Sequence, residues 1–241
     1  MISIDKKKSV IQERKKRKRD QQEASIIEAA KKIFFSKGYL KATIDEIALE
    51  AEASKPTIYQ FFKTKDDLFF SLMLPVIEDI GKQMEKVEKK ILAGKYTAGD
   101  LLVRDLFRAF YHSYELSPDT FRIVQLFQQT GLVSQLQPEV RSALNERGRY
   151  NFALGRSIIR QGIQIGLIKE VNEYELSDLI WGLTVGVIQL EDIKSDHKQG
   201  NKFKKATLTL AEDIFIQALT QNEKKGLKDR KDRRIEANIR L

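Results

Sequence analysis

The chain of 241 residues contains no cysteine, four prolines and two histidines. Without cysteine it can form neither disulfide bonds nor thiolate metal sites, which fits a reducing compartment such as the cytoplasm. Its longest nearly uncharged apolar run covers residues 179–190, whereas a membrane-spanning helix needs about 20 apolar residues. We therefore expect a cytoplasmic protein that does not contact a membrane.

The scarcity of histidine also bears on catalysis. His112 and His197 are far apart in the sequence, no glycine-rich phosphate loop follows a strand, and no nucleophile motif is present. Metal sites need their ligands in clusters, and the sequence shows none of the usual spacings. We expect no catalytic residue, no metal and no cofactor, and we expect that the chain is not an enzyme.

The net charge of +9 lies entirely in the two ends of the chain. Residues 1–24 carry nine Lys or Arg against four Asp or Glu, and residues 223–241 carry eight against four, so the part between them is neutral. One interpretation is that both ends are solvated, poorly ordered tails. The other is that residues 1–19, which include the run KKRKR, form a flexible basic arm that binds a polyanion.

The pattern of apolar residues between the tails predicts an all-α fold. Alternating Val, Ile and Thr is nearly absent, and apolar residues recur at helical spacing. We expect a first helix at 22–36 that ends near Gly38, and glycine stops at Gly94 and Gly166. Pro75 should kink or break a long helix that starts at Asp66. Further helices are expected at 98–115, 118–129, 138–165, 174–196 and 202–222.

Two short helices are predicted between residues 43 and 62. The order Thr43-Ile44-Asp45-Glu46 matches a capping box, in which the threonine oxygen and the glutamate satisfy free backbone N–H groups. Ser54 is a plausible N-cap for the second helix, and Pro56 fits its first turn. Two short helices joined by a tight turn after a longer helix indicate a helix-turn-helix unit, whose second helix enters the major groove of DNA.

The second short helix has two different faces. Ile58 and Phe62 lie four residues apart and point inward together. The other face, with the residues that follow the helix, contains no acid and offers hydrogen-bond donors: Lys55, Thr57, Tyr59, Gln60, Lys63 and Lys65. Phosphate contacts supply affinity and base contacts supply specificity; lysine suits guanine, and glutamine suits adenine.

These residues resemble the DNA-binding domain of TetR-type transcriptional regulators. The similarity covers residues 29–68 and includes Gly38-Tyr39, Thr43-Ile44 and Thr57-Ile58-Tyr59, and residues 162–188 are similar to the penultimate-helix region of that family. The resemblance implies a helical homodimer in which an N-terminal domain (20–70) binds DNA and a larger helical domain (71–222) provides regulation and dimerisation, followed by a basic tail (223–241). The implied DNA contacts are Thr43, Lys55, Pro56, Thr57, Tyr59, Gln60 and Lys65.

Three residues depart from the pattern of the family. Pro56 replaces the commoner glycine, a variant that stiffens the start of the second short helix. Glu52 stands where glycine is usual in the turn, so a glutamate must adopt the backbone angle that the turn imposes. Phe61 stands where a histidine or tyrosine often contacts phosphate, and phenylalanine cannot donate a hydrogen bond. The side of the helix on which Phe61 lies stays open at this point.

The regulatory domain contains aromatic residues that either line a ligand cavity or form the core: Phe107, Phe110, Tyr111, Tyr114, Phe127, Phe152 and Trp181. A cavity of this kind suits a small apolar or amphipathic effector. The helices at 174–196 and 202–222 are expected to form a four-helix dimer interface, so that two binding units read a roughly palindromic operator. We expect a repressor that the effector releases from DNA. The alternative is a ligand-independent, largely non-specific nucleic-acid-binding protein that acts through its basic tails.

Overall fold

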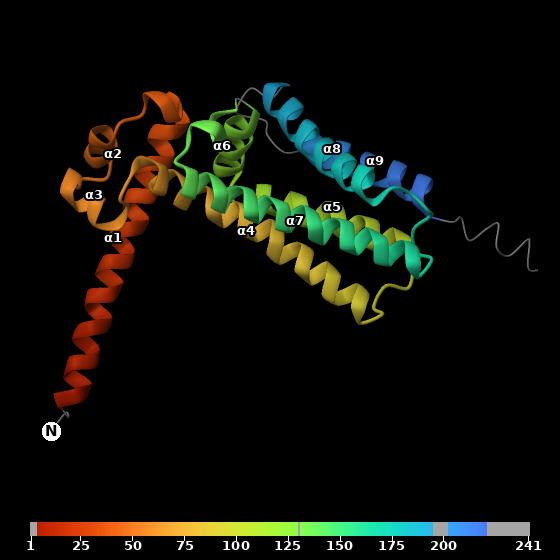
Figure 1. Cartoon of the computed structure of the whole chain (residues 1–241), viewed down its shortest axis with the longest axis horizontal. Helices are drawn as coiled ribbons and strands as arrows, with labels where there is room; N and C mark the ends of the chain where they lie inside the picture. The colour runs from red at the N-terminus through yellow and green to blue at the C-terminus, as the bar shows by residue number, and fades with distance from the viewer. Residues whose placement is uncertain (1–3, 130, 195–201, 221–241) are drawn as a thin grey trace, which may run out of the picture. The chain divides into compact units, whose positions relative to one another are not determined.

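The computed structural model describes residues 4–129, 131–194 and 202–220 (Figure 1). Within these ranges it contains nine α-helices, one short 3-10 turn and no strand, which confirms the all-α prediction. The chain forms two compact units. Unit 1 combines the residues up to Glu78 with Leu116–Glu146, and unit 2 combines Asp79–Glu115 with the residues from Arg147 onward.

The helices agree closely with the predicted ranges from α5 onward. The helices are α1 (Ile4–Lys41), α2 (Ile44–Glu50), α3 (Lys55–Phe61), α4 (Lys65–Leu92), α5 (Gly99–Leu116), α6 (Pro118–Gln129), α7 (Pro138–Gln164), α8 (Glu173–Lys194) and α9 (Lys202–Leu219), with the 3-10 turn at Leu132–Gln135. The predicted ends at 195–196 and 221–222 and the basic tail at 223–241 lie outside the described residues.

The start of the first helix differs from the prediction. Helix α1 begins at Ile4, not near Gln22, so the described part of the expected arm is helical (Figure 1). The reason is local, because residues 4–21 contain no glycine or proline and are rich in Lys, Arg, Glu and Gln, which all favour helix. The helix is interrupted at Gly38, whose φ of 74° and ψ of 162° lie in a region that is essentially open to glycine alone.

Pro75 does not break α4. The helix is continuous from Lys65 to Leu92, and Pro75 lies inside it with its ring exposed to solvent. Proline removes one backbone N–H, and the carbonyl that loses its partner needs another one. On the solvent side of the helix, water can serve that carbonyl, and the buried residues on the opposite side keep the helix in place.

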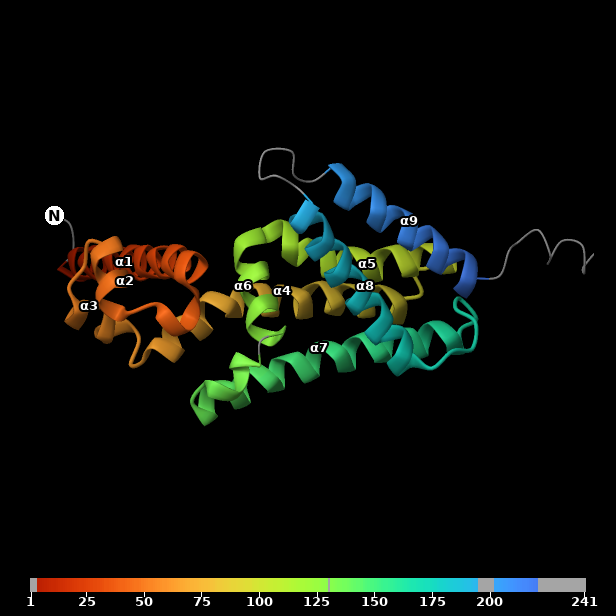
Figure 2. The same ribbon diagram turned by 90° about the horizontal axis from the view of Figure 1, so that it is seen from above.

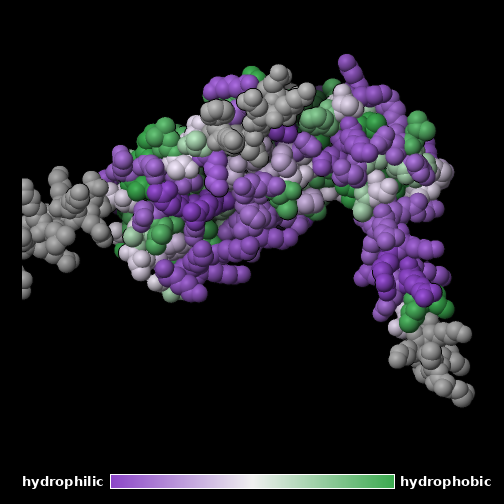
Figure 3. All heavy atoms as spheres, turned by 180° about the vertical axis from the view of Figure 1, so that it is seen from behind, coloured by the Kyte–Doolittle hydropathy of each residue, from purple (hydrophilic) through white to green (hydrophobic). Residues whose placement is uncertain are grey.

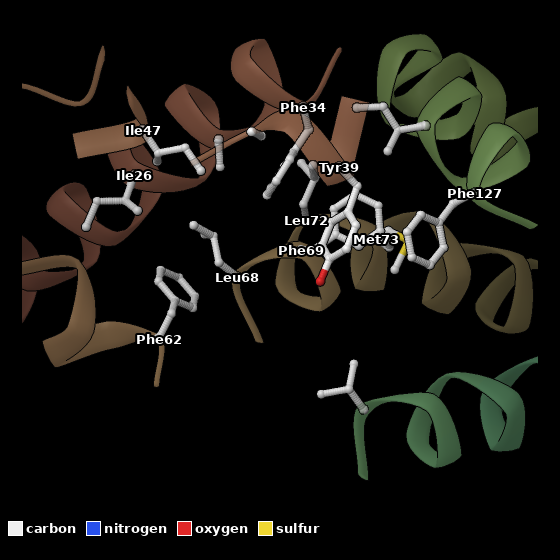
Figure 4. Close-up of a cluster of buried hydrophobic side chains, with 14 of the residues drawn as sticks. Ile26, Phe34, Tyr39, Ile47, Phe62, Leu68, Phe69, Leu72, Met73 and Phe127 are labelled. Atoms are coloured by element: carbon white, nitrogen blue, oxygen red, sulfur yellow. The ribbon is translucent and has the colours of Figure 1, made fainter. Parts of the chain in front are cut away.

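The core of unit 1 joins α1 to α4 and α6. Figure 4 shows this cluster of buried side chains, in which the ring of Phe69 packs against Phe34 at 5.0 Å and against Phe127 at 4.5 Å between ring centroids. Tyr39 completes the cluster, and its hydroxyl donates to the buried carboxylate of Asp66. The second oxygen of Asp66 accepts from the backbone N–H of Gln137 at 2.8 Å. The aromatic packing and this carboxylate therefore fix the end of α1 to the start of α4.

The core of unit 2 is built from its part of α4 together with α5, α7, α8 and α9 (Figure 2). Gly94 and Gly166 end α4 and α7 with positive φ angles of 63° and 76°, which confirms both predicted stops. Figures 1 and 2 both show α8 and α9 side by side. Among the described residues, no helix combines the length and apolar character that crossing a bilayer requires.

Candidate functional site

The start of α2 is fixed by the predicted capping box. The Thr43 hydroxyl accepts from the backbone N–H of Glu46 at 3.2 Å, and the Glu46 carboxylate accepts from the backbone N–H of Thr43 at 3.1 Å. These two bonds satisfy two of the N–H groups that a helix start leaves without partners. The Thr43 hydroxyl still has its own hydrogen to donate, as a phosphate contact would require.

The turn between α2 and α3 is a Schellman motif. The backbone N–H of Ala53 donates to the carbonyl oxygen of Ala48 at 2.9 Å, and the backbone N–H of Glu52 donates to the carbonyl oxygen of Leu49 at 3.2 Å. This motif requires a left-handed residue at its corner, and Glu52 takes that conformation with a φ of 49°. Gly94 and Gly166 occupy the same corner in two other helix ends of the chain. The glutamate has therefore accepted the backbone angle that glycine usually provides.

Helix α3 begins as the sequence predicts. The Ser54 hydroxyl accepts from the backbone N–H of Thr57 at 3.2 Å and lies 2.7 Å from the Thr57 hydroxyl. Pro56 occupies the first turn of the helix. The Thr57 side chain is therefore engaged at the start of its own helix, and it is half-buried.

The two faces of α3 separate as expected. Ile58 is fully buried, and Phe62, the C-cap of the helix, is buried with it. The residues on the other side are exposed, and they are Lys55, Pro56, Tyr59 and Gln60. The structure thus brings together, on one exposed surface, four of the seven residues predicted to contact DNA. We call these four residues the α3 surface.

Lys55 has an acidic partner within the protein. Its ammonium group donates to the carboxylate of Asp45 at 3.0 Å, and both side chains are exposed. The hydrogen bond with Asp45 and its negative charge raise the pKa of Lys55. The sequence pattern of α3 shows no acid, but the acid comes from the first turn of α2. The α3 surface is therefore less positive than its own sequence implies.

Lys65 holds the end of α1. Its ammonium group donates to the backbone carbonyls of Tyr39 at 3.0 Å and Ala42 at 3.2 Å, and lies 4.4 Å from the centre of the Tyr39 ring. A cation at the C-terminal end of a helix satisfies free carbonyl groups there. An ammonium group has three hydrogens, so one remains for a phosphate. The contact of Lys65 with DNA stays a prediction, beside a structural role that the sequence did not reveal.

Phe61 lies on the side of α3 that faces α1. It is half-buried against the core of unit 1, and the guanidinium carbon of Arg19 lies 5.6 Å from the centre of its ring. Phe61 and Gln60 line a hollow of about 350 Å³ together with Lys18, Arg19 and Gln22 of α1. The basic segment of α1 therefore borders the recognition helix directly.

The N-terminal half of α1 carries a basic surface. The side chains of the KKRKR run at 15–19 are all exposed, and Figure 3 shows hydrophilic side chains covering this part of the helix. Within this run Arg17 forms an ion pair with Glu13 at 3.6 Å. The described residues 9–19 thus present several cations on one helix.

The seven aromatic candidates for a ligand site are divided between the two units. Phe127 packs in the core of unit 1, whereas the other six belong to unit 2. The reason is that α6 packs with α1 and α4 in that unit. In unit 2 the ring of Trp181 packs against Phe110 and Phe152, with distances of 5.1 Å and 6.3 Å between ring centroids. Tyr114 is buried. Phe107 and Tyr111 line a separate hollow.

That hollow lies between α5 and α9 and measures about 460 Å³. Its lining includes two apolar groups, buried Phe107 and Leu208, and several charged ones. Arg104 lies within it and donates to Glu212 at 3.1 Å and to Asp213 at 2.8 Å, which links α5 to α9. We call this space the α5/α9 hollow.

His112 also lines the α5/α9 hollow and is tied to α4. Its Nδ1 lies 2.7 Å from the carboxylate of Asp79, which also accepts from Ser113 at 2.8 Å and Gln83 at 2.9 Å. Burial acts to raise the pKa of Asp79, but the hydrogen bonds from His112, Gln83 and Ser113 outweigh it and lower that pKa. The sequence did not indicate this pair, because 33 residues separate its members.

Comparison with known proteins identifies relatives over most of the chain. A family model described as bacterial regulatory proteins of the tetR family matches residues 26–72. The fatty acid metabolism regulator protein of Bacillus subtilis is 31% identical over 177 residues, which cover 71% of this chain and 85% of that protein.

Two solved structures share the fold. One is the transcriptional regulator FadR from Bacillus subtilis in complex with stearoyl-CoA, with a TM-score of 0.58, 22% identity, and coverage of 80% of this chain and 95% of that one. The other is the ketosteroid transcriptional regulator KstR2 of Mycobacterium tuberculosis, with a TM-score of 0.65, 16% identity, and coverage of 83% and 95%.

Proposed function

The chain belongs to the TetR family of bacterial regulatory proteins and is a DNA-binding transcriptional regulator; from this premise we propose that it is a dimeric repressor that a fatty-acyl effector releases from a roughly palindromic operator. The observation that carries the proposal is the α3 surface, in which exposed donors stand on a helix that is capped at its start and buried on its other face. A helix presented in this way suits the major groove. Such a protein acts where bacterial DNA lies, in the cytoplasm.

The DNA contacts divide into two kinds. Thr43 and the start of α2 suit a phosphate, because a helix N-terminus offers free N–H groups and a partial positive charge. Lys65 offers its remaining hydrogen to the same kind of partner. Lys55 and Gln60 suit base edges, guanine and adenine respectively. Tyr59 is half-exposed and offers its hydroxyl to a base or to the backbone. Pro56 belongs to the α3 surface, and half-buried Thr57 borders it.

A dimer interface on α8 and α9 has support from their exposed apolar residues. On α8 these form one helix face: Leu179, Gly182, Gly186, Leu190 and Ile193. A Cβ atom built on Gly182 or Gly186 meets no atom within 4 Å, so a second helix has room to approach. Leu210 and Ile214 form a similar exposed pair on α9. Exposed apolar faces of this kind are typical of protein interfaces.

The class of effector rests on the relatives. The Bacillus subtilis relative is named for fatty acid metabolism, and the solved structure of FadR from the same species is a complex with stearoyl-CoA. The α5/α9 hollow combines apolar and charged side chains, and its volume falls within the roughly 300–1,000 Å³ of small-molecule sites. An effector with an acyl chain and an anionic head group matches both observations.

The test is binding of the full-length protein to a palindrome from upstream of its own gene, measured by fluorescence anisotropy against random DNA at two salt concentrations. We expect at least a hundredfold preference for the palindrome, and at least a tenfold loss of operator affinity on adding dodecanoyl-CoA. Replacing Gln60 by alanine should reduce the preference, whereas replacing the exposed Lys89 of α4 should not. A preference near one would support the alternative, a non-specific nucleic-acid-binding protein acting through basic tails, which the exposed cations of α1 also permit.

The dimer is tested separately by light scattering at micromolar concentration. A Gly186→Leu variant fills the space beside α8 and should shift the mass from dimer to monomer, and Gly148→Leu, on α7, is the matched control because its added side chain also meets open space. A monomeric mass of the unaltered protein, with and without DNA, would contradict the dimer.

A further inference from the structure

We propose that the α5/α9 hollow binds the anionic head group of the effector, a carboxylate or a phosphate, which displaces the Glu212 carboxylate from Arg104 and is sensed by α4 through His112. This inference rests on the proposed function, because it assigns a place and a mechanism to the regulation of the same protein. The proposed anion site consists of described residues of unit 2 alone.

The lining of the hollow suits an amphipathic anion. Buried Phe107 and Leu208 supply an apolar floor, while Arg108 and Lys205 are exposed at its edge. Cations bind carboxylates and phosphates through short, charge-assisted hydrogen bonds. An acyl chain can cover the floor while the head group meets the cations.

Arg104 already binds carboxylates in this position. Its guanidinium group donates to Glu212 and Asp213, and the Glu212 side chain is only 14% exposed. Burial raises the pKa of Glu212, and the charge of Arg104 opposes that effect without overcoming it. A buried carboxylate of this kind is a costly partner, so another anion can replace it on the guanidinium while Asp213 stays bound.

His112 connects the hollow to α4. Its Nδ1 is engaged with Asp79, so Nε2 is the ring nitrogen that remains for an occupant of the hollow. A head group can accept from Nε2 only when both ring nitrogens carry a hydrogen. Two hydrogen bonds would then connect the head group to α4, one from His112 Nε2 to the head group and one between His112 Nδ1 and Asp79. Asp79 acts here as a positioning residue.

Helix α4 provides the continuation of this path. Asp79 lies in the same unbroken helix as Lys65, whose ammonium group holds the carbonyls at the end of α1. If Asp79 moves along or around the helix axis, Lys65 at the start of α4 can move with it, because no loop separates the two residues. The effector changes the population of DNA-binding conformations only if it binds one of them better, and the exchange on Arg104 offers such a difference.

The first experiment measures binding of three probes to the full-length protein by isothermal titration calorimetry. The probes are dodecanoate, dodecanoyl-CoA and dodecanol, which share the apolar chain and differ in head group. We expect at least one of the two anions to bind at least tenfold more tightly than dodecanol. The two anions distinguish a carboxylate from a phosphate-bearing head group. Equal binding of dodecanol, or no binding of either anion at 1 mM, would overturn the proposal.

The second experiment uses variants with the anion that binds. Lys205→Ala and Arg108→Ala should each weaken binding about fivefold, and Glu212→Gln should strengthen it about threefold, because the competing carboxylate is gone. The matched control is Lys89→Ala, an exposed lysine that does not line the hollow. Unchanged binding in both cation variants, or weaker binding in Glu212→Gln, would place the site elsewhere.

The third experiment separates the sensor from the site. Asp79→Asn should bind the anion within about threefold of the unaltered protein but should lose most of the release from operator DNA. Full release by this variant would overturn the role of the His112–Asp79 pair. If the anion binds in the hollow and the unaltered protein still stays on DNA, the anion site stands, and the proposed release and its sensor are wrong.

Discussion

The ammonium group of Lys55 donates to the carboxylate of Asp45 at 3.0 Å, so the first turn of α3 is tied to the first turn of α2. Both side chains are exposed, and solvent weakens an ion pair of this kind, so it contributes little to the stability of the fold. We expect its effect on DNA binding to be larger than its effect on the fold, because Asp45 would repel phosphates and occupies a cation of the α3 surface.

Replacing Asp45 by asparagine should therefore tighten operator binding. We expect about a fivefold gain, which corresponds to roughly 1 kcal/mol. Fluorescence anisotropy with the operator measures it. In a Lys55→Gln background the same replacement should have a smaller effect, since no ammonium group is left to release. Equal gains in both backgrounds would show that Asp45 acts only by repelling phosphate.

Replacing Glu52 by glycine should stabilise the protein. A left-handed conformation costs an L-residue roughly 1–2 kcal/mol, and the extra freedom of glycine in the unfolded chain offsets about 0.5–1 kcal/mol of the gain. We expect a net gain of about 0.5 kcal/mol, seen as a rise of about 1–2 °C in the midpoint of thermal unfolding.

Gly94 and Gly166 allow the reverse substitution to be tested as a control for Glu52→Gly. They hold the same corner of the same motif, and a Cβ atom on either meets nothing within 4 Å. Gly94→Ala and Gly166→Ala should therefore destabilise by about 1 kcal/mol through the backbone angle alone. A loss of stability in Glu52→Gly would mean that the glutamate side chain makes a favourable contribution that outweighs its strain.

Local patterns in the sequence predicted the start and stop of most helices. The capping box at Thr43 and Glu46, the N-cap at Ser54 and the two glycine stops all depend on neighbours within five residues, and the structure confirms each of them. The burial of Ile58 and Phe62 follows from helical spacing in the same way.

Contacts between distant residues could not be predicted. Lys65 reaches carbonyls 23 and 26 residues away, and no periodic pattern indicates which lysine will do so. The position of Phe127 depends on which unit α6 joins, and a run of aromatic residues does not contain that information. The helical form of residues 4–21 has another cause, because a dense run of charge is typical of a disordered tail, whereas the individual residues favour helix.

The cations of α1 should contribute to the salt dependence of DNA binding. Replacing Lys15, Lys16 and Arg17 by glutamine removes three charges and keeps good helix formers. Each lost phosphate contact lowers the slope of log affinity against log salt by about 0.9, so we expect a decrease of up to about 3. The matched control is Lys89→Gln in unit 2. An unchanged slope would remove this part of α1 from the DNA interface.

Asp79 should make stability depend on acid. Its pKa in the folded protein lies below the ordinary value of 3.8, so its contribution is present above that pH and is lost as the pH falls towards the folded pKa. Asp79→Asn should lower stability at pH 7 by about 1–3 kcal/mol and flatten the fall in stability below pH 4. Denaturant unfolding from pH 3 to pH 7 measures both effects. The exposed Glu170→Gln variant serves as control, and the same acid slope in Asp79→Asn would contradict the assignment.

The helical form of the N-terminal segment has a thermodynamic consequence. An irregular segment loses backbone freedom when it settles on a partner, at about 1–2 kcal/mol for each residue that becomes ordered. In α1 the backbone from Ile4 onward is already ordered within the free protein. The attraction between its cations and phosphate is then not reduced by an ordering cost, and only the side chains have freedom left to lose.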